Sequence, residues 1–144
     1  MWSEPVEFTI PGKPVPKGRP RASVRRMGQR HVARMRTPAR TKTYEATVRA
    51  SAPRVSVPSR GLYWVELRMV VSKPGARPSQ TPREAWSEAE PFHAGRVDAD
   101  NVAKAVLDGL QGWLGNDARV VRLHVEKRCG DRPRVDVVVR WWAA

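Results

Sequence analysis

Cysteine is nearly absent from the sequence, with Cys129 as the single one among 144 residues. A lone cysteine cannot form a disulfide within the chain or supply the several thiolates of a zinc site, and we interpret it as an inert thiol near a turn. The three histidines, His31, His93 and His124, lie far apart and match neither HxxxH nor HxxE. A histidine-based zinc site is therefore not expected either.

Long hydrophobic runs are also missing. No stretch approaches the roughly 18 consecutive apolar residues that a transmembrane helix needs, and the opening MWSEPVEFTIPG lacks the basic and apolar regions of a secretory signal. We therefore expect a cytoplasmic protein that is neither secreted nor bound in a membrane. The sequence has no P-loop, GxGxxG motif or Ser-His-Asp grouping, so a nucleotide cofactor and covalent acyl chemistry have no support.

Acidic residues are scarce, at 14 against 27 Lys and Arg, which gives a net charge of +13. So large a charge on so short a chain favours a polyanionic partner, with nucleic acid first and an anionic membrane surface second. The length supports a single domain over residues 1–144. A hydrophobic fraction of 40% with six tryptophans supplies a core for it, so we expect the chain to be folded.

The charges are separated along the sequence. Between Phe8 and Tyr44 there are eleven basic residues and no acid, whereas the window from Glu84 to Asp117 holds seven acids and two bases, a net −5. A purely electrostatic binder of nucleic acid has little reason to keep a concentrated negative site, which repels phosphate unless a cation joins the two. The contrast therefore indicates a separate acidic site in addition to a positively charged binding surface.

The hydrophobic pattern predicts an α/β fold of one domain, with a mixed sheet and the element order β-α-β-α-β-β. Apolar residues alternate in the four predicted strands and recur at helical spacing in the two helices. Residues 11–42 show neither period, and we interpret them as a long, irregular basic N-terminal loop or arm. We expect strands at 6–10, 63–71, 121–126 and 135–141, helices at 41–50 and 101–113, and a hairpin turn at 130–133.

The most informative stretch is residues 93–121. Asp98 and Asp100 stand two apart in an extended segment entering a helix, so both carboxylates project to one side, and such hard oxygen ligands suit Mg²⁺ or Mn²⁺. Asn101, Lys104 and Asp108 follow at i, i+3 and i+7 and form a polar stripe on that helix. A lysine there can stabilise charge on a metal-bound phosphate.

Each of these residues also has an ordinary structural explanation. Asp98 or Asp100 can cap the helix, and Lys104 can form an exposed pair with Asp100 or Asp108. Asp117, in a glycine-rich turn after Asn116, can be a turn residue, while His93 is a candidate phosphate contact. These explanations weaken when the residues are taken together, because all of them fall in one acidic window of a basic chain.

The same stretch resembles the RusA family of Holliday-junction resolvases, endodeoxyribonucleases that are common in phages and prophages. The residues that carry the resemblance are DADN at 98–101, KAVLDGL at 104–110 and NDARVV at 116–121, together with FTIPGKPVPKGRPR at 8–21 and TPARTKTYEATVR at 37–49. The resemblance implies a homodimer that uses Mg²⁺ or Mn²⁺ to cut branched DNA. It implies metal-binding catalytic acids at Asp98, Asp100 and Asp117 and a catalytic lysine at Lys104. Where the family commonly has two consecutive acids, this chain has Asn116 and Asp117, and we assign the ligand to Asp117.

The predicted helix poses a geometric problem. From Asn101 to Gly112 it is about 18 Å long at 1.5 Å per residue, so Asp117 begins at the end away from Asp98. Either the glycine-rich turn folds back along the helix, or the third acid comes from another subunit. A homodimer is expected in any case, since two coordinated cuts call for two matching sites.

Taken together, the sequence predicts a metal-dependent endonuclease that acts on four-way junctions in recombination and repair and associates with the nucleoid. We expect the DNA backbone to be gripped by Lys13, Lys17, Arg19, Arg21, Arg25, Arg26 and Arg96. Two alternatives remain: a non-catalytic basic protein that binds nucleic acid, and a structural protein associated with RNA.

Overall fold

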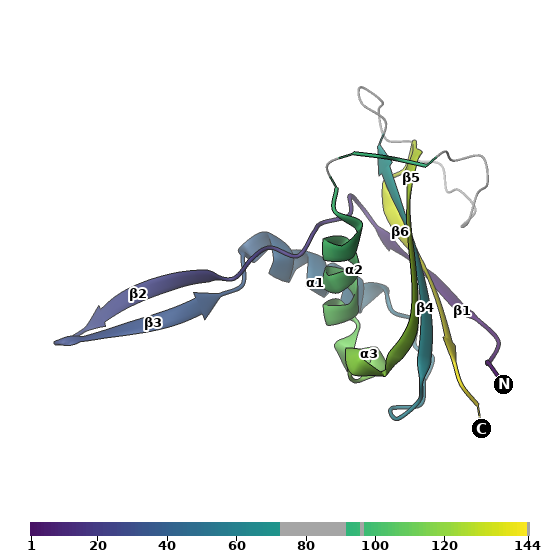
Figure 1. Ribbon diagram of the computed structural model, residues 1–144, viewed down its shortest axis with the longest axis horizontal. Helices are drawn as coiled ribbons and strands as arrows, with labels where there is room; N and C mark the ends of the chain where they lie inside the picture. The colour runs from purple at the N-terminus through teal and green to yellow at the C-terminus, as the bar shows by residue number, and fades with distance from the viewer. Residues whose placement is uncertain (73–91, 96, 144) are drawn as a thin grey trace.

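The computed structural model describes residues 1–72, 92–95 and 97–143 (Figure 1). Within this part of the chain, none of the helices has the length and apolar character needed to cross a membrane. The elements, in chain order, are β1 (Val6–Pro11), β2 (Arg21–Met27), β3 (Arg30–Arg36), α1 (Ala39–Ser51), β4 (Tyr63–Ser72), α2 (Ala99–Gly109), α3 (Gln111–Leu114), the 3₁₀ turn η1 (Asp117–Arg119), β5 (Val120–Gly130) and β6 (Arg134–Trp141).

Four of the strands form a mixed sheet in the order β1-β6-β4-β5, which confirms the predicted α/β class. β4 and β5 run parallel, whereas β6 runs antiparallel to both β4 and β1. A parallel pair needs a crossover connection, and α2 lies on the one that links β4 to β5. The edge strand β5 therefore begins next to the helix that carries the acidic motif.

The hairpin predicted at residues 130–133 is wrong. β5 and β6 do not pair with each other, because β4 lies between them and pairs with both. Turn residues mark a reversal of the chain, but they do not decide which strand becomes the neighbour. All of β6 from Arg134 to Val139 is buried, as suits a strand with neighbours on both sides.

Helices α1 and α2 cover one face of the sheet (Figure 1). The predicted apolar stripe of Val102, Val106 and Leu110 is fully buried against the strands. The two helices approach closely at Gly109, where an added Cβ would lie 2.7 Å from the Val48 side chain. This contact holds α2 at a fixed distance from α1 and thereby positions the acidic motif.

The basic arm is not the irregular loop that the sequence predicted. Residues 21–36 form a β-hairpin, β2–β3, which extends away from the body of the molecule (Figure 1). Its turn uses Gly28 at φ +64°, a left-handed conformation that glycine adopts without strain. Most of its side chains are exposed on both faces, so no alternation of buried and exposed residues marked these strands in the sequence.

Candidate active site beside helix α2

A depression of about 500 Å³ lies between the outer side of α2 and strand β5. Three of the four predicted catalytic residues line it: Asp100, Lys104 and Asp117. The rest of its wall is formed by alanine, leucine and valine side chains: Ala99, Ala103, Leu107, Leu123 and Val125.

Asp117 reaches this depression within the same chain. α2 ends at Gly109, and the short helix α3 leads to Gly115, whose φ of +79° turns the chain back. β5 then runs alongside α2 and carries Asp117 just before its first residue. The folded-back turn, one of the two routes that the sequence left open, places Asp117 on the wall of the same depression as Asp100 and Lys104.

Side-chain capping does not account for Asp98 or Asp117, whereas Asp100 lies in the first turn of α2, where an acid is stabilised by the helix dipole. Asp98 occupies the N-cap position of α2, but its carboxylate makes no capping hydrogen bond and instead accepts one from Nδ2 of Asn101 at 3.0 Å. At the 3₁₀ turn the cap is Asn116, whose Oδ1 accepts a hydrogen bond from the Ala118 amide at 2.9 Å. Asp117 is therefore not needed as the capping residue of its own turn.

Lys104 is likewise not held in a structural ion pair. It is exposed, and in the described part of the chain its ammonium has no carboxylate partner. Asp108, one turn further along α2, pairs with Lys17 at 2.7 Å instead. Lys104 thus shares the depression with Asp100 and Asp117 and, in the described part of the chain, forms an ion pair with neither.

The carboxylates of the depression are oxygen donors of the kind that bind divalent metal ions. Among the described residues, no three His, Cys, Asp or Glu side chains lie close enough to form a complete site. Mg²⁺ at phosphoryl-transfer sites, however, is held by one or two carboxylates, with waters and substrate oxygens completing the shell. Asp100 and Asp117 are carboxylates of the kind that such an open site uses, and both line the depression, whereas Asp98 is not part of its wall.

Comparison with known proteins decides the family. The model of the family Endodeoxyribonuclease RusA matches residues 11–140, which include the hairpin, α2 and the turn that carries Asp117. The chain belongs to the RusA family. It is also 31% identical over 139 residues to the uncharacterized protein YqaN of Bacillus subtilis (strain 168), a match that covers 94% of this chain and 95% of that protein.

The segment that leads into the acidic motif of this RusA chain is held by Lys127, a residue that sequence reasoning missed. Its ammonium donates hydrogen bonds to the carbonyls of Val97, at 2.7 Å, and Gly95, at 3.2 Å. The backbone amide of His93 donates a hydrogen bond to the carbonyl of Lys127 at 3.0 Å, which attaches the backbone of His93 to β5. Nothing in the sequence singled out Lys127, because it stands among alternating strand residues. Arg96 lies outside the described residues.

The hairpin of this RusA chain has two chemically different faces. Directly opposite residues of antiparallel strands have their side chains on the same face of the ribbon. The observed register therefore gathers five arginines on one face and leaves fewer, more apolar residues on the other. The basic face carries Arg21, Arg25, Arg30, Arg34 and Arg36; the other face carries Ala22, Val24, Arg26, His31, Ala33 and Met35.

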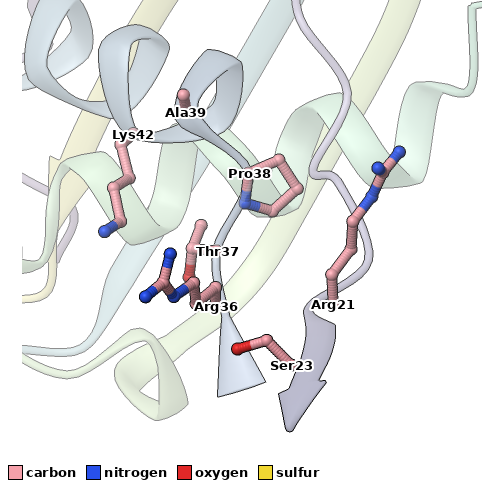
Figure 2. A pocket seen from close by; sticks show the side chains of 7 residues that line it. All are labelled: Arg21, Ser23, Arg36, Thr37, Pro38, Ala39 and Lys42. Atoms are coloured by element: carbon pink, nitrogen blue, oxygen red, sulfur yellow. The ribbon is translucent and has the colours of Figure 1, made fainter. Parts of the chain in front are cut away.

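A basic pocket lies at the root of the hairpin, where β2 and β3 meet α1 (Figure 2). Arg21, Arg36 and Lys42 line it together with Ser23 and Thr37. The first turn of α1 holds no acidic residue, and its N-cap is Pro38, whose side chain cannot cap the helix. Three cations and hydroxyl groups beside a helix N-terminus match the chemistry of a backbone phosphate.

The remaining predicted DNA contacts fall into two groups. Lys13, Arg19, Arg25 and Arg26 are exposed and accessible to a partner, and Arg25 and Arg26 lie on the hairpin. Lys17 differs from them, since its ammonium contacts two carboxylates.

Proposed function

We propose that this protein is a metal-dependent, structure-specific endodeoxyribonuclease that resolves Holliday junctions and related branched DNA in recombination and repair. Family membership supports endodeoxyribonuclease activity. The observation that carries the proposal for this chain is the meeting of Asp100, Lys104 and Asp117 in one depression, none of them used in a structural contact. A protein that only bound DNA would gain nothing from two carboxylates placed there.

In the proposed mechanism, Asp100 and Asp117 would hold Mg²⁺ or Mn²⁺, which when bound supplies an activated water and offsets charge on the leaving 3′ oxygen. Lys104 donates a hydrogen bond to a non-bridging oxygen of the scissile phosphate, where negative charge develops. Leu107, Leu123 and the rest of the apolar wall exclude water from one side of the phosphate and strengthen both interactions. The arginines of the hairpin bind the DNA backbone and bring it to the depression.

We expect replacement of Lys104 by methionine to lower the single-turnover rate of junction cleavage by about a hundredfold to a thousandfold, the usual cost of one donor to a developing anion. Because Lys104 is one of many cations, junction affinity should change far less. Rapid-quench cleavage and a binding isotherm on the same junction measure the two effects. Equal losses in rate and affinity would instead make Lys104 an ordinary backbone contact.

The proposed active form is a homodimer. Resolution of a four-way junction requires two cuts, and a two-fold dimer supplies two matching sites. Asp98 is not part of the wall of the depression. In a dimer, its carboxylate is available to contact either the edge of the site or the second subunit. We expect sedimentation equilibrium to give about twice the chain mass of 16.2 kDa in the concentration range that supports cutting. A monomer that cuts both strands of a junction at equal rates would contradict the dimer.

A fixed four-way junction, offered beside a linear duplex and a fork of the same sequence, tests the proposal. The proposed function requires metal-dependent cutting of the junction in preference to the duplex. Binding of all three without any cutting would identify a non-catalytic DNA-binding protein, and a preference for folded RNA would identify an RNA-associated one.

A further inference from the structure

The segment that leads into the hairpin, residues 14–18, is locked between α1 and α2. Pro14 is buried, the amide of Lys17 donates to the carbonyl of Asn101 at 2.9 Å, and the amide of Gly18 donates to Oγ1 of Thr41 at 2.9 Å. A Cβ added to Gly18 would lie 2.8 Å from Cγ of Pro38, so a larger residue cannot occupy the position unless the side chains at the start of α1 shift. We call residues 14–18 the stem.

Lys17 fastens the stem to both helices through ion pairs. Its Nζ lies 2.5 Å from Oε1 of Glu45 on α1 and 2.7 Å from Oδ2 of Asp108 on α2, and each of the three side chains is about one-fifth exposed. Burial alone would lower the pKa of Lys17, but the hydrogen bonds and charges of Asp108 and Glu45 outweigh burial and raise the pKa above its ordinary value of 10.5. The ammonium is therefore charged at neutral pH, and two carboxylates already use that charge.

The hairpin has few other attachments to the body. β2 and β3 pair with each other along their whole length and extend away from the sheet (Figure 1). Their direction relative to the body is therefore set at the root, by the stem on one side and by the short link from Arg36 into α1 on the other. Of these two, the stem is the one that touches α2.

We propose that Lys17, with Glu45 and Asp108, forms an ion-pair lock that fixes the direction of the hairpin relative to α2. Lys17 is then a positioning residue and not a phosphate contact. Since α2 carries Asp100 and Lys104, the lock sets where the DNA backbone held by the hairpin crosses the depression. The consequence for cutting rests on the proposed function, whereas the direction of the hairpin is a property of the protein alone.

The lock and a phosphate contact at Lys17 differ in what they predict for the direction of the hairpin when either carboxylate is changed, since only the lock ties that direction to Glu45 and Asp108. If Lys17 touched DNA, replacing Glu45 by glutamine or Asp108 by asparagine would remove a competing negative charge and strengthen DNA binding. In the lock, the same substitutions release the stem and should act like replacement of Lys17 itself. The substitution Glu7→Gln removes one exposed carboxylate from β1, outside the lock, and is the matched control.

The direct test measures the direction of the hairpin without DNA. Spin labels are attached at Gln29→Cys in the hairpin turn and Gln111→Cys on α3, in a Cys129→Ser background. The labelled protein is diluted with unlabelled protein, so that distances between subunits do not contribute. Pulsed dipolar spectroscopy should give a narrow distance distribution for the parent and for Glu7→Gln, and a clearly broader one for Lys17→Met, Glu45→Gln and Asp108→Asn. Unchanged distributions in all three lock variants would overturn the proposal.

Thermal unfolding separates a released stem from an unfolded chain. The distributions are compared only for variants that retain a single cooperative transition, and the near-isosteric Glu45→Gln and Asp108→Asn remain available if Lys17→Met does not fold.

Cutting gives a second readout. The lock predicts that Lys17→Met cuts a fixed junction at several neighbouring positions where the parent favours one, while the dependence of binding on salt is unchanged. Lys13 is an exposed cation, so Lys13→Met should instead reduce the slope of log K against log salt by about one and leave the position of the cut unchanged. A loss of about one unit of slope in Lys17→Met, with a narrow spin-label distribution, would make Lys17 a phosphate contact and overturn the lock. Failure of the parent protein to cut any junction would contradict the proposed function, and the spin-label distances would still decide the lock.

Discussion

Replacing Asp100 or Asp117 by asparagine is expected to lower junction cleavage by about a thousandfold or more, which corresponds to roughly 4 kcal/mol of lost transition-state stabilisation. Asparagine has nearly the same shape as aspartate but no negative charge, so it binds a divalent cation poorly. Both side chains are exposed, α2 has no side-chain N-cap bond, and the cap of the 3₁₀ turn η1 is Asn116. The fold should therefore survive, and single-turnover cleavage at saturating protein measures the loss.

Binding separates this prediction from a general electrostatic effect. With the metal chelated, the two variants should bind the junction at least as tightly as the parent, because each has lost a negative charge near the phosphate. Glu7→Gln makes the same change in net charge, but Glu7 lies on β1, which carries none of the proposed site residues. This variant should therefore cut at the parent rate. Wild-type rates in both aspartate variants would show that the depression is not the site of the chemistry.

The second large effect is expected on the basic face of the hairpin. Changing Arg25, Arg30 and Arg34 together to glutamine should weaken junction binding by about a hundredfold at moderate salt and reduce the slope of log K against log salt by about three. The three residues share one exposed face of a ribbon with no structural role in the core. Fluorescence anisotropy over a range of salt concentrations gives both quantities.

A matched triple variant controls for net charge. Arg49, Arg54 and Arg60 are exposed and lie outside the hairpin, so changing them to glutamine removes the same three charges from the body. If both triple variants lost affinity and slope equally, the positive charge of the whole molecule, and not the hairpin, would be responsible for binding.

The sequence predicted helix α2 and its buried side well because the signals for a helix are local. Val102, Val106 and Leu110 marked the buried side of α2, so the opposite side, with Lys104, had to face outward. The arrival of Asp117 beside that side could not be predicted, since it depends on a turn at Gly115 and on the parallel pairing of β5 with β4. Pairing between strands that are distant in the sequence leaves no local pattern.

The hairpin and the lock escaped prediction for related reasons. Strands that are exposed on both faces carry no buried alternation, and here arginines occupy six of the fourteen strand positions. Lys17 looked like one more cation of the arm, because its partners Glu45 and Asp108 lie 28 and 91 residues away in the sequence. Sequence alone gives the charge of such a residue but not whether another residue has already neutralised it.

The central claim is that the chain cuts branched DNA through carboxylates that require a divalent cation. Its most direct test is to titrate Mg²⁺ and Mn²⁺, from a chelated start, into the wild-type protein bound to a fixed four-way junction, and to follow both strands on a denaturing gel. We expect no cutting in chelator, paired nicks that appear with added metal, and salt-sensitive binding that is present throughout. Stable binding with no cutting of the junction at any metal concentration, or cutting that persists in chelator, would contradict the claim.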